Sequence, residues 1–63
     1  MKQSDLPKIG APAMRALASI GVSSLEQVAK HSRADLLRLH GMGPKAIRIL
    51  HDALKVEGLD FKS

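Results

Sequence analysis

The sequence contains no cysteine, no tryptophan, no tyrosine and a single phenylalanine among its 63 residues. Without cysteine, the chain can form neither disulfides nor thiolate metal sites. With one aromatic residue, it lacks the stacking platforms on which single-strand binders and most RNA-recognition sheets hold unpaired bases. No apolar run approaches the ~20 residues of a membrane-spanning helix, and the start "MKQSDLPKIG" is unlike a signal peptide. We therefore expect one soluble domain in the cytoplasm, with no membrane partner.

Basic residues, in contrast, are in excess. Ten lysines and arginines stand against six aspartates and glutamates, which gives a formal net charge of +4. Such an excess favours a polyanionic partner, although many small basic proteins bind nothing anionic. The two signs are also separated along the chain, because residues 6–25 and 36–51 contain no acid. Unless the separation arose by chance, it is the distribution that a phosphate-facing surface needs.

The pattern of apolar residues predicts an all-α fold, since no segment alternates in the manner of a strand. Helices are expected over residues 12–19, 24–31, 33–39 and 44–57, with a short extra turn near residues 4–9. Pro12 and Pro44 suit the first turn of a helix, and Ser32 suits a helix cap. Before the second helix, either Ser23 or Ser24 can open a capping box. The short linkers predict a compact bundle of four main helices.

Helical spacing also predicts which side chains form the core. The expected buried residues are Met14, Leu17, Leu25, Val28, Ala29, Leu36, Leu39, Met42, Ile47, Leu50, Ala53 and Leu54, with Leu59 and Phe61 folding back onto them. Ala18 and Leu37 are candidates for partial burial. An internal echo relates residues 6–17 to residues 39–50, both with an apolar residue, a glycine turn and a helix that a proline starts. We therefore expect two related hairpins, at about residues 6–20 and 33–56 of a single domain spanning 1–63.

The stretch "HGMGPKA" concentrates backbone freedom next to a positive charge. Gly41 and Gly43 supply unusual backbone angles and remove side chains that would keep another molecule from the backbone. Pro44 has no N–H, so Gly43, Lys45 and Ala46 are the expected free donors at the helix start, where an anion is favoured. The Lys45 ammonium can approach the same anion. The same residues would also fit a simple tight turn between helices.

The glycine turn and the helices on either side of it resemble a known family. The run "LLRLHGMGPKAIRIL" resembles the helix-hairpin-helix motif, in which an apolar pair precedes Gly-apolar-Gly, Pro-Lys and an apolar helix. Residues 6–61, with "RALASIGVSSLEQV" and "LHDALKVEGLDF", are similar to the C-terminal domain of the bacterial RNA polymerase alpha subunit. The resemblance implies a SAM-like fold with two helix-hairpin-helix motifs. It also implies binding to duplex DNA, with little or no sequence specificity, through backbone amides that contact phosphates.

Carried over position by position, the resemblance puts Gly41, Gly43, Lys45 and Ala46 at phosphate contacts. The full set of candidate nucleic-acid-binding residues is Lys8, Arg15, Arg38, His40, Gly41, Gly43, Lys45, Ala46 and Arg48. The polymerase domain has a serine at Ala46 and a groove-entering arginine at Pro12, so those two contacts are absent here. Arg15 falls at an asparagine that faces DNA and can replace part of the missing charge. Lys8 stands where the first hairpin would have its first glycine, so we expect one strong phosphate site rather than two.

Other chemistry fits the sequence less well. His31, His40 and His51 are spaced too widely for a local metal-ligand pair, so we expect no metal and no cofactor. A Schiff-base role for Lys45, as in lyases of this family, would require further domains, so we expect no enzyme. The alternative function is a protein-interaction module of a transcription or DNA-processing complex. We expect a monomer and, from Met1 and the ending after Phe61, a whole protein; the cellular process and any DNA sequence preference stay open.

Overall fold

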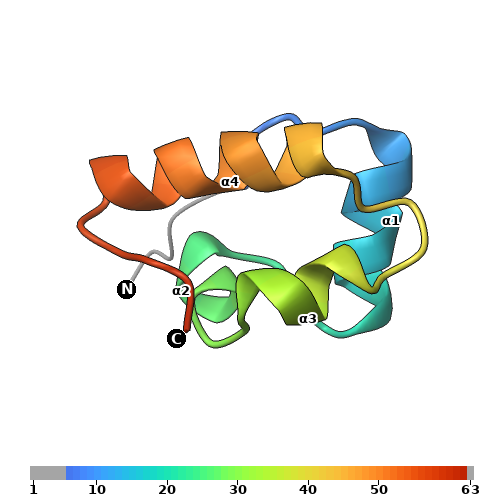
Figure 1. Ribbon diagram of the computed structural model, residues 1–63, viewed down its shortest axis with the longest axis horizontal. Coiled ribbons are helices and arrows are strands. Elements are labelled where there is room, and N and C mark those ends of the chain that lie inside the picture. Colours follow the sequence, from blue (N-terminus) through green and yellow to red (C-terminus); the bar gives the residue numbers. More distant parts are fainter. Residues whose placement is uncertain (1–5, 63) are drawn as a thin grey trace.

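Four helices make up the regular structure of the described chain. The computed structural model describes residues 6–62. Helix α1 spans Ala11–Ser19, α2 Leu25–Val28, α3 Arg33–Leu37 and α4 Pro44–Val56. In Figure 1, α4 runs along the top, α2 and α3 lie below it, and α1 closes the right-hand end. Residues 6–62 contain no strand, which confirms the all-α architecture that the sequence predicts.

The starts of α2 and α3 follow the capping signals in the sequence. The Ser32 hydroxyl accepts a hydrogen bond from the Asp35 N–H at 3.0 Å. The Ser24 hydroxyl accepts one from the Gln27 N–H at 3.3 Å. The Gln27 side chain in turn accepts from the backbone N–H of Ser23 at 2.6 Å. Ser24 is therefore the cap and Ser23 the residue that Gln27 reaches, so both serines before α2 take part in one capping arrangement.

Both short helices end earlier than the apolar pattern predicts. After α2, the His31 N–H donates to the Val28 carbonyl at 3.0 Å, and after α3 the Leu39 N–H donates to the Leu36 carbonyl at 3.1 Å. These bonds join residues three apart, so the chain closes a tighter turn instead of continuing the helix. At the N-terminus, residues 6–10 form no helix or turn, and the rest of the predicted extra turn lies outside the described residues.

The core lies between α4 and the other helices. Leu17, Leu36, Leu50 and Leu54 are fully buried, and each burial contributes about 2–3 kcal/mol. Leu25, Val28, Met42 and Ile47 are buried as predicted, and Ala29, Leu39, Ala53, Leu59 and Phe61 pack partly buried against the core. The prediction for Met14 is wrong, because its side chain is 38% exposed. Helix α1 instead buries Ala13 and Ala16, whose small side chains allow close packing, and Ala18 is exposed.

The segment after α4 folds back across the molecule. The Lys62 N–H donates to the carbonyl of His31 at 3.0 Å, which ties the end of the chain to the turn after α2. The Phe61 ring stacks on His51 of α4, with 6.0 Å between ring centroids. The guanidinium of Arg33, the first residue of α3, lies 5.6 Å from the centroid of the same ring. One aromatic side chain therefore joins α3 to α4.

The carboxyl of Asp60 fixes the start of this segment. It accepts hydrogen bonds from the Phe61 N–H at 2.8 Å and from the Lys55 ammonium at 3.2 Å. These two contacts, in that order, lower the pKa of Asp60 below its ordinary value of 3.8. Because the pKa is lower in the folded state, the charged carboxylate stabilises the fold at pH values above 3.8 and this contribution is lost as the pH falls through the folded pKa.

We therefore expect the Asp60 carboxyl, followed by NMR, to titrate with a midpoint below 3.8. In a Lys55→Met variant the midpoint should move part of the way back, because the Phe61 N–H still donates to the carboxylate. A midpoint at or above 3.8 in the unmodified protein would contradict the contacts described for this segment.

Candidate nucleic-acid interface

The turn between α3 and α4 rests on the first turn of α1. Gly41 has φ +90°, and a Cβ added there would lie 2.8 Å from the backbone carbonyl oxygen of Pro12. Met42 is buried, and its N–H donates to the Leu39 carbonyl at 3.1 Å. This burial confirms that Met42 anchors the turn in the core. Gly41 is required because only a residue without a side chain allows so close an approach to α1.

Gly43 has a different environment from Gly41. Its φ of −112° is accessible to any residue, and a Cβ added there would meet no atom within 4 Å. Neither the backbone angle nor the packing of the described residues therefore requires glycine. The absent side chain does leave the space in front of α4 open to the backbone of the turn.

The N-terminus of α4 is open for a ligand. Gly43 precedes the helix, Pro44 is its first residue, and the Ile47 N–H makes the first helical bond, to the Gly43 carbonyl at 3.1 Å. The amides of Lys45 and Ala46 therefore have no partner within the helix, and no side chain of the described residues caps it. The side chain of Lys45 is exposed and that of Ala46 is buried. Ala46 can thus meet a ligand only through its N–H.

Helix α1 starts in the same manner as α4, but its N-terminus has fewer hydrogen-bond donors and less positive charge. Gly10 precedes it, as Gly43 precedes α4, and Pro12 occupies the position that corresponds to Lys45. Because proline has no N–H and no charge, this end has fewer donors for an anion. The internal echo extends into the core at four buried positions, namely Ala13, Leu17, Ala46 and Leu50.

Two of the predicted basic residues lie beside the turn. Arg15 of α1 and His40 line an open groove of about 430 Å³ together with Pro12 and Gly41. The contact between Gly41 and Pro12 forms the boundary of this groove, so α1 and the turn meet in it. The structure therefore brings Arg15 next to His40 and Gly41, although Arg15 lies far from both in the sequence.

The other predicted basic residues lie elsewhere. Lys8 lines a separate groove before and along the start of α1, and Arg38 follows the end of α3. Arg48 lines a third groove, between α3 and α4, with Arg33 and His51. Arg33 is not among the residues predicted from the sequence. Arg33 lies four residues before Leu37, and this spacing could have shown that the two side chains share a face of α3.

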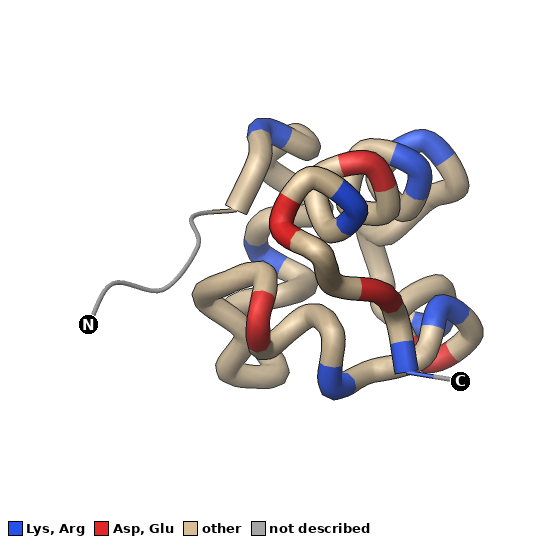
Figure 2. Tube along the Cα trace, turned by 90° about the vertical axis from the view of Figure 1, so that its left-hand side faces the viewer, with Lys and Arg blue, Asp and Glu red and all other residues tan. Residues whose placement is uncertain are grey.

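Acidic residues avoid the turn. From residue 36 to residue 51 the sequence has none, whereas Asp52, Glu57 and Asp60 lie in the last turns of α4 and the segment after it. That end of α4 faces the viewer in Figure 2, where acidic positions are interspersed with basic ones. The α3–α4 turn lies at the opposite end of the helix (Figure 1). An anion that approaches the turn therefore meets positive charge and helix amides, and residues 36–51 add no carboxylate there.

Two further properties concern the described residues alone. No three of their histidine, aspartate or glutamate side chains lie close enough together to hold a metal ion. Within residues 6–62, no helix has the length and apolar character needed to cross a membrane.

Comparison with known proteins gives one match. A family model described as a SAM-like helix-hairpin-helix tandem matches residues 4–57. No curated protein and no solved structure matches the chain.

Proposed function

Because the chain belongs to the SAM-like helix-hairpin-helix tandem family, we propose that it binds duplex DNA through the phosphates, with little sequence specificity. Domains of this kind typically bind DNA non-specifically. The proposal assigns the main contact to Gly41, Gly43, Lys45 and Ala46. The similarity of the sequence to the polymerase alpha domain supports a setting in transcription or DNA processing, in which the protein acts as a monomeric binding module and not as an enzyme.

The observation that carries the proposal is the open N-terminus of α4. A phosphate oxygen placed there can accept hydrogen bonds from the amides of Lys45 and Ala46, at the positive end of the helix dipole. The Lys45 ammonium adds a charged contact. Gly43 adds no side chain to the open space beside it, which leaves this space free for a phosphate. Neither the backbone angle nor the packing requires glycine at this position, although glycine is a moderately favoured helix cap.

The surrounding charge extends the contact. Arg15 and His40, in the groove beside Gly41, are placed to meet a neighbouring phosphate. Lys8, Arg38 and Arg48 contribute to the general attraction from their separate positions. Because α1 has Pro12 where α4 has Lys45, the proposal has one strong phosphate site rather than two. Binding of one copy is then weak and depends steeply on salt.

An NMR titration at low salt tests the proposal. When a short DNA duplex is added to the isotope-labelled protein, we expect the amides of Gly41, Gly43, Lys45 and Ala46 to shift most. The amides of Lys30 and Lys62, at the ends of α2 and of the chain, should shift least because they lie outside the turn. The proposal fails if the four turn amides stay in place with duplex in excess.

A Gly43→Ala substitution tests the approach of DNA to the backbone. We expect the free energy of unfolding to fall by no more than about 1 kcal/mol, because the Cβ enters open space and glycine is only a moderate helix cap. DNA affinity should fall about fivefold or more if the phosphate uses the open space beside Gly43, because the new methyl group would occupy part of that space.

Gly58→Ala, just beyond the other end of α4, is the matched control. Its φ of +72° predicts a loss of stability, while DNA affinity should not change. If the Gly43→Ala variant binds DNA as tightly as the unmodified protein does, DNA does not approach the backbone at Gly43.

A further inference from the structure

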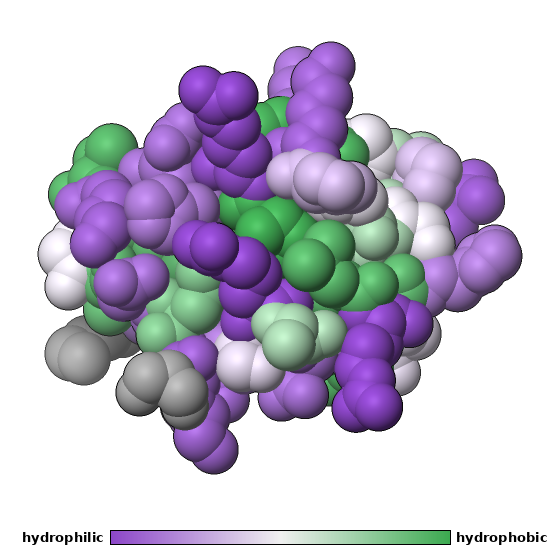
Figure 3. Space-filling model, in the orientation of Figure 1, coloured by the Kyte–Doolittle hydropathy of each residue, from purple (hydrophilic) through white to green (hydrophobic). Residues whose placement is uncertain are grey.

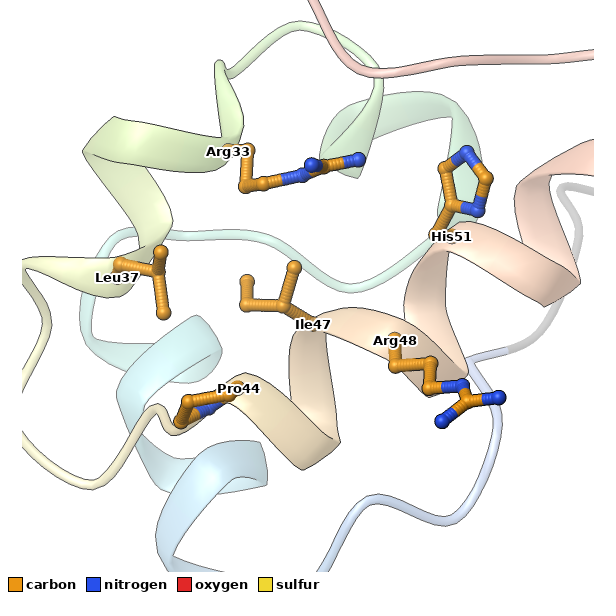
Figure 4. Close-up of a pocket in the computed structure, with 6 residues that line it drawn as sticks. All are labelled: Arg33, Leu37, Pro44, Ile47, Arg48 and His51. Carbon is orange, nitrogen blue, oxygen red and sulfur yellow. The ribbon is translucent and has the colours of Figure 1, made fainter.

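The groove between α3 and α4 combines an apolar floor with a basic rim. It has a volume of about 280 Å³ and opens to solvent (Figure 4). Leu37, Pro44 and Ile47 form its apolar part, and Arg33, Arg48 and His51 form its basic part. None of the residues that line it is acidic.

The apolar part of this groove is accessible from outside. Leu37 is 41% exposed and Pro44 is exposed too, whereas Ile47 is buried. In Figure 4, Leu37 and Ile47 point toward each other from α3 and α4. Figure 3 shows apolar surface on this face of the molecule, surrounded by hydrophilic residues. A DNA phosphate gains nothing from such a floor, because apolar contact does not replace the water that an anion loses. An apolar side chain from another molecule does gain from it.

The basic rim is held in place before any ligand arrives. The guanidinium of Arg33 lies 5.6 Å from the centroid of the Phe61 ring, and the His51 ring stacks on the same side chain with an interplanar angle of 15°. Figure 4 shows Arg33 reaching toward His51 across one end of the groove. Side chains that are already ordered lose less conformational entropy when a ligand binds. Arg33 is therefore better prepared to bind a carboxylate than a freely moving surface arginine.

We propose that this groove binds a short amphipathic segment of a partner protein, one that presents apolar side chains and carboxylates on the same face. The apolar side chains would cover Leu37 and Pro44, and the carboxylates would meet Arg33 and Arg48. Charge complementarity defines this occupant through Arg33 and Arg48, since His51 already has the Asp52 carboxylate 3.9 Å from its Nδ1. The proposal goes beyond DNA binding and does not depend on it, since Lys45 and the groove of Arg15 and His40 take no part.

A labelled synthetic peptide tests this inference. The probe is a short helical peptide in which leucines recur every three or four positions among glutamates, so that one face is apolar. We expect it to bind the full-length protein in a fluorescence anisotropy titration and to shift the amides of Leu37, Ile47 and Arg48. Leu37→Ser should weaken binding about tenfold, as loss of a buried apolar anchor does.

Val56→Ser is the matched control, because Val56 is 83% exposed at the far end of α4 and its loss removes an apolar side chain outside the groove. Both positions are exposed, so both variants should fold. Unchanged affinity in Leu37→Ser, or equal binding of a peptide made of glutamate alone, would overturn the proposal. The proposal would also be overturned if added DNA duplex shifted the Leu37 amide strongly and the Leu37→Ser variant bound DNA more weakly. The groove would then be a nucleic-acid surface. Peptide binding in a protein that fails to bind DNA would support the proposal.

Discussion

Replacement of Gly41 by alanine is expected to lower the free energy of unfolding by about 2–4 kcal/mol. Two effects add at this position. The φ of +90° disfavours any residue with a side chain, and the new Cβ would lie 2.8 Å from the Pro12 carbonyl oxygen, which is backbone and cannot rotate away. A domain of this length has a total stability of roughly 3–9 kcal/mol, so the variant would lose a large part of it.

Urea denaturation followed by circular dichroism measures this loss, and Gly21→Ala separates its two causes. Gly21 also has a positive φ, of +75°, but a Cβ there would meet no atom within 4 Å. We expect Gly21→Ala to cost about 1 kcal/mol from the backbone angle alone. If Gly41→Ala costs no more than Gly21→Ala, the close contact between the α3–α4 turn and Pro12 is wrong.

Lys45→Glu is expected to weaken binding to a DNA duplex about 10- to 100-fold at low salt. The substitution removes the ammonium beside the amides of α4 and puts a carboxylate where the phosphate would bind. It should also reduce the slope of log affinity against log salt by about one phosphate contact. Lys45 is exposed, so the thermal stability should stay close to that of the unmodified protein.

Lys30→Glu provides the control for net charge. Lys30 is exposed beyond the end of α2, and its replacement changes the total charge by the same amount. We expect DNA affinity to fall about twofold or less in this variant, because only long-range attraction is affected. Equal losses in the two variants would mean that binding follows total charge and not the α3–α4 turn. Unchanged affinity in Lys45→Glu would contradict the assignment of the phosphate site.

Sequence predicts the starts of the helices better than their ends or their buried faces. Ser24 and Ser32 cap their helices through contacts with residues three positions later, and such local signals can be read directly. At the ends of α2 and α3, backbone carbonyls accept hydrogen bonds from N–H groups three residues later instead of four. Any residue type allows this change, so no side chain in the sequence indicates where these helices end. Met14 and Ala13 are neighbours on α1, and apolar spacing did not decide which of them faces the core. The close packing of α1 decides it.

The candidate site shows the same division. Sequence selected both glycines of the turn and gave them one role, to clear the way for another molecule. The structure separates them, because Gly41 meets the carbonyl of Pro12 and Gly43 faces open space. The contact with Pro12 and the cluster of Arg33, Phe61 and His51 join segments that are distant along the chain, and no local pattern encodes them. Residue type nominated the phosphate donors that we propose, and tertiary structure decides which glycine serves the fold.

The close contact between Gly41 and the backbone of Pro12 also limits how this motif could be grafted onto another protein. A hairpin made of residues 33–56 alone would lack the Pro12 carbonyl that lies beside Gly41. It would also lack Leu17 of α1, which belongs to the same hydrophobic core. A designer who grafts the Gly-Met-Gly-Pro-Lys turn onto another scaffold must therefore also supply a helix start that approaches the first glycine. Copies of the turn without such a support should hold the conformation of the turn less firmly than this protein does.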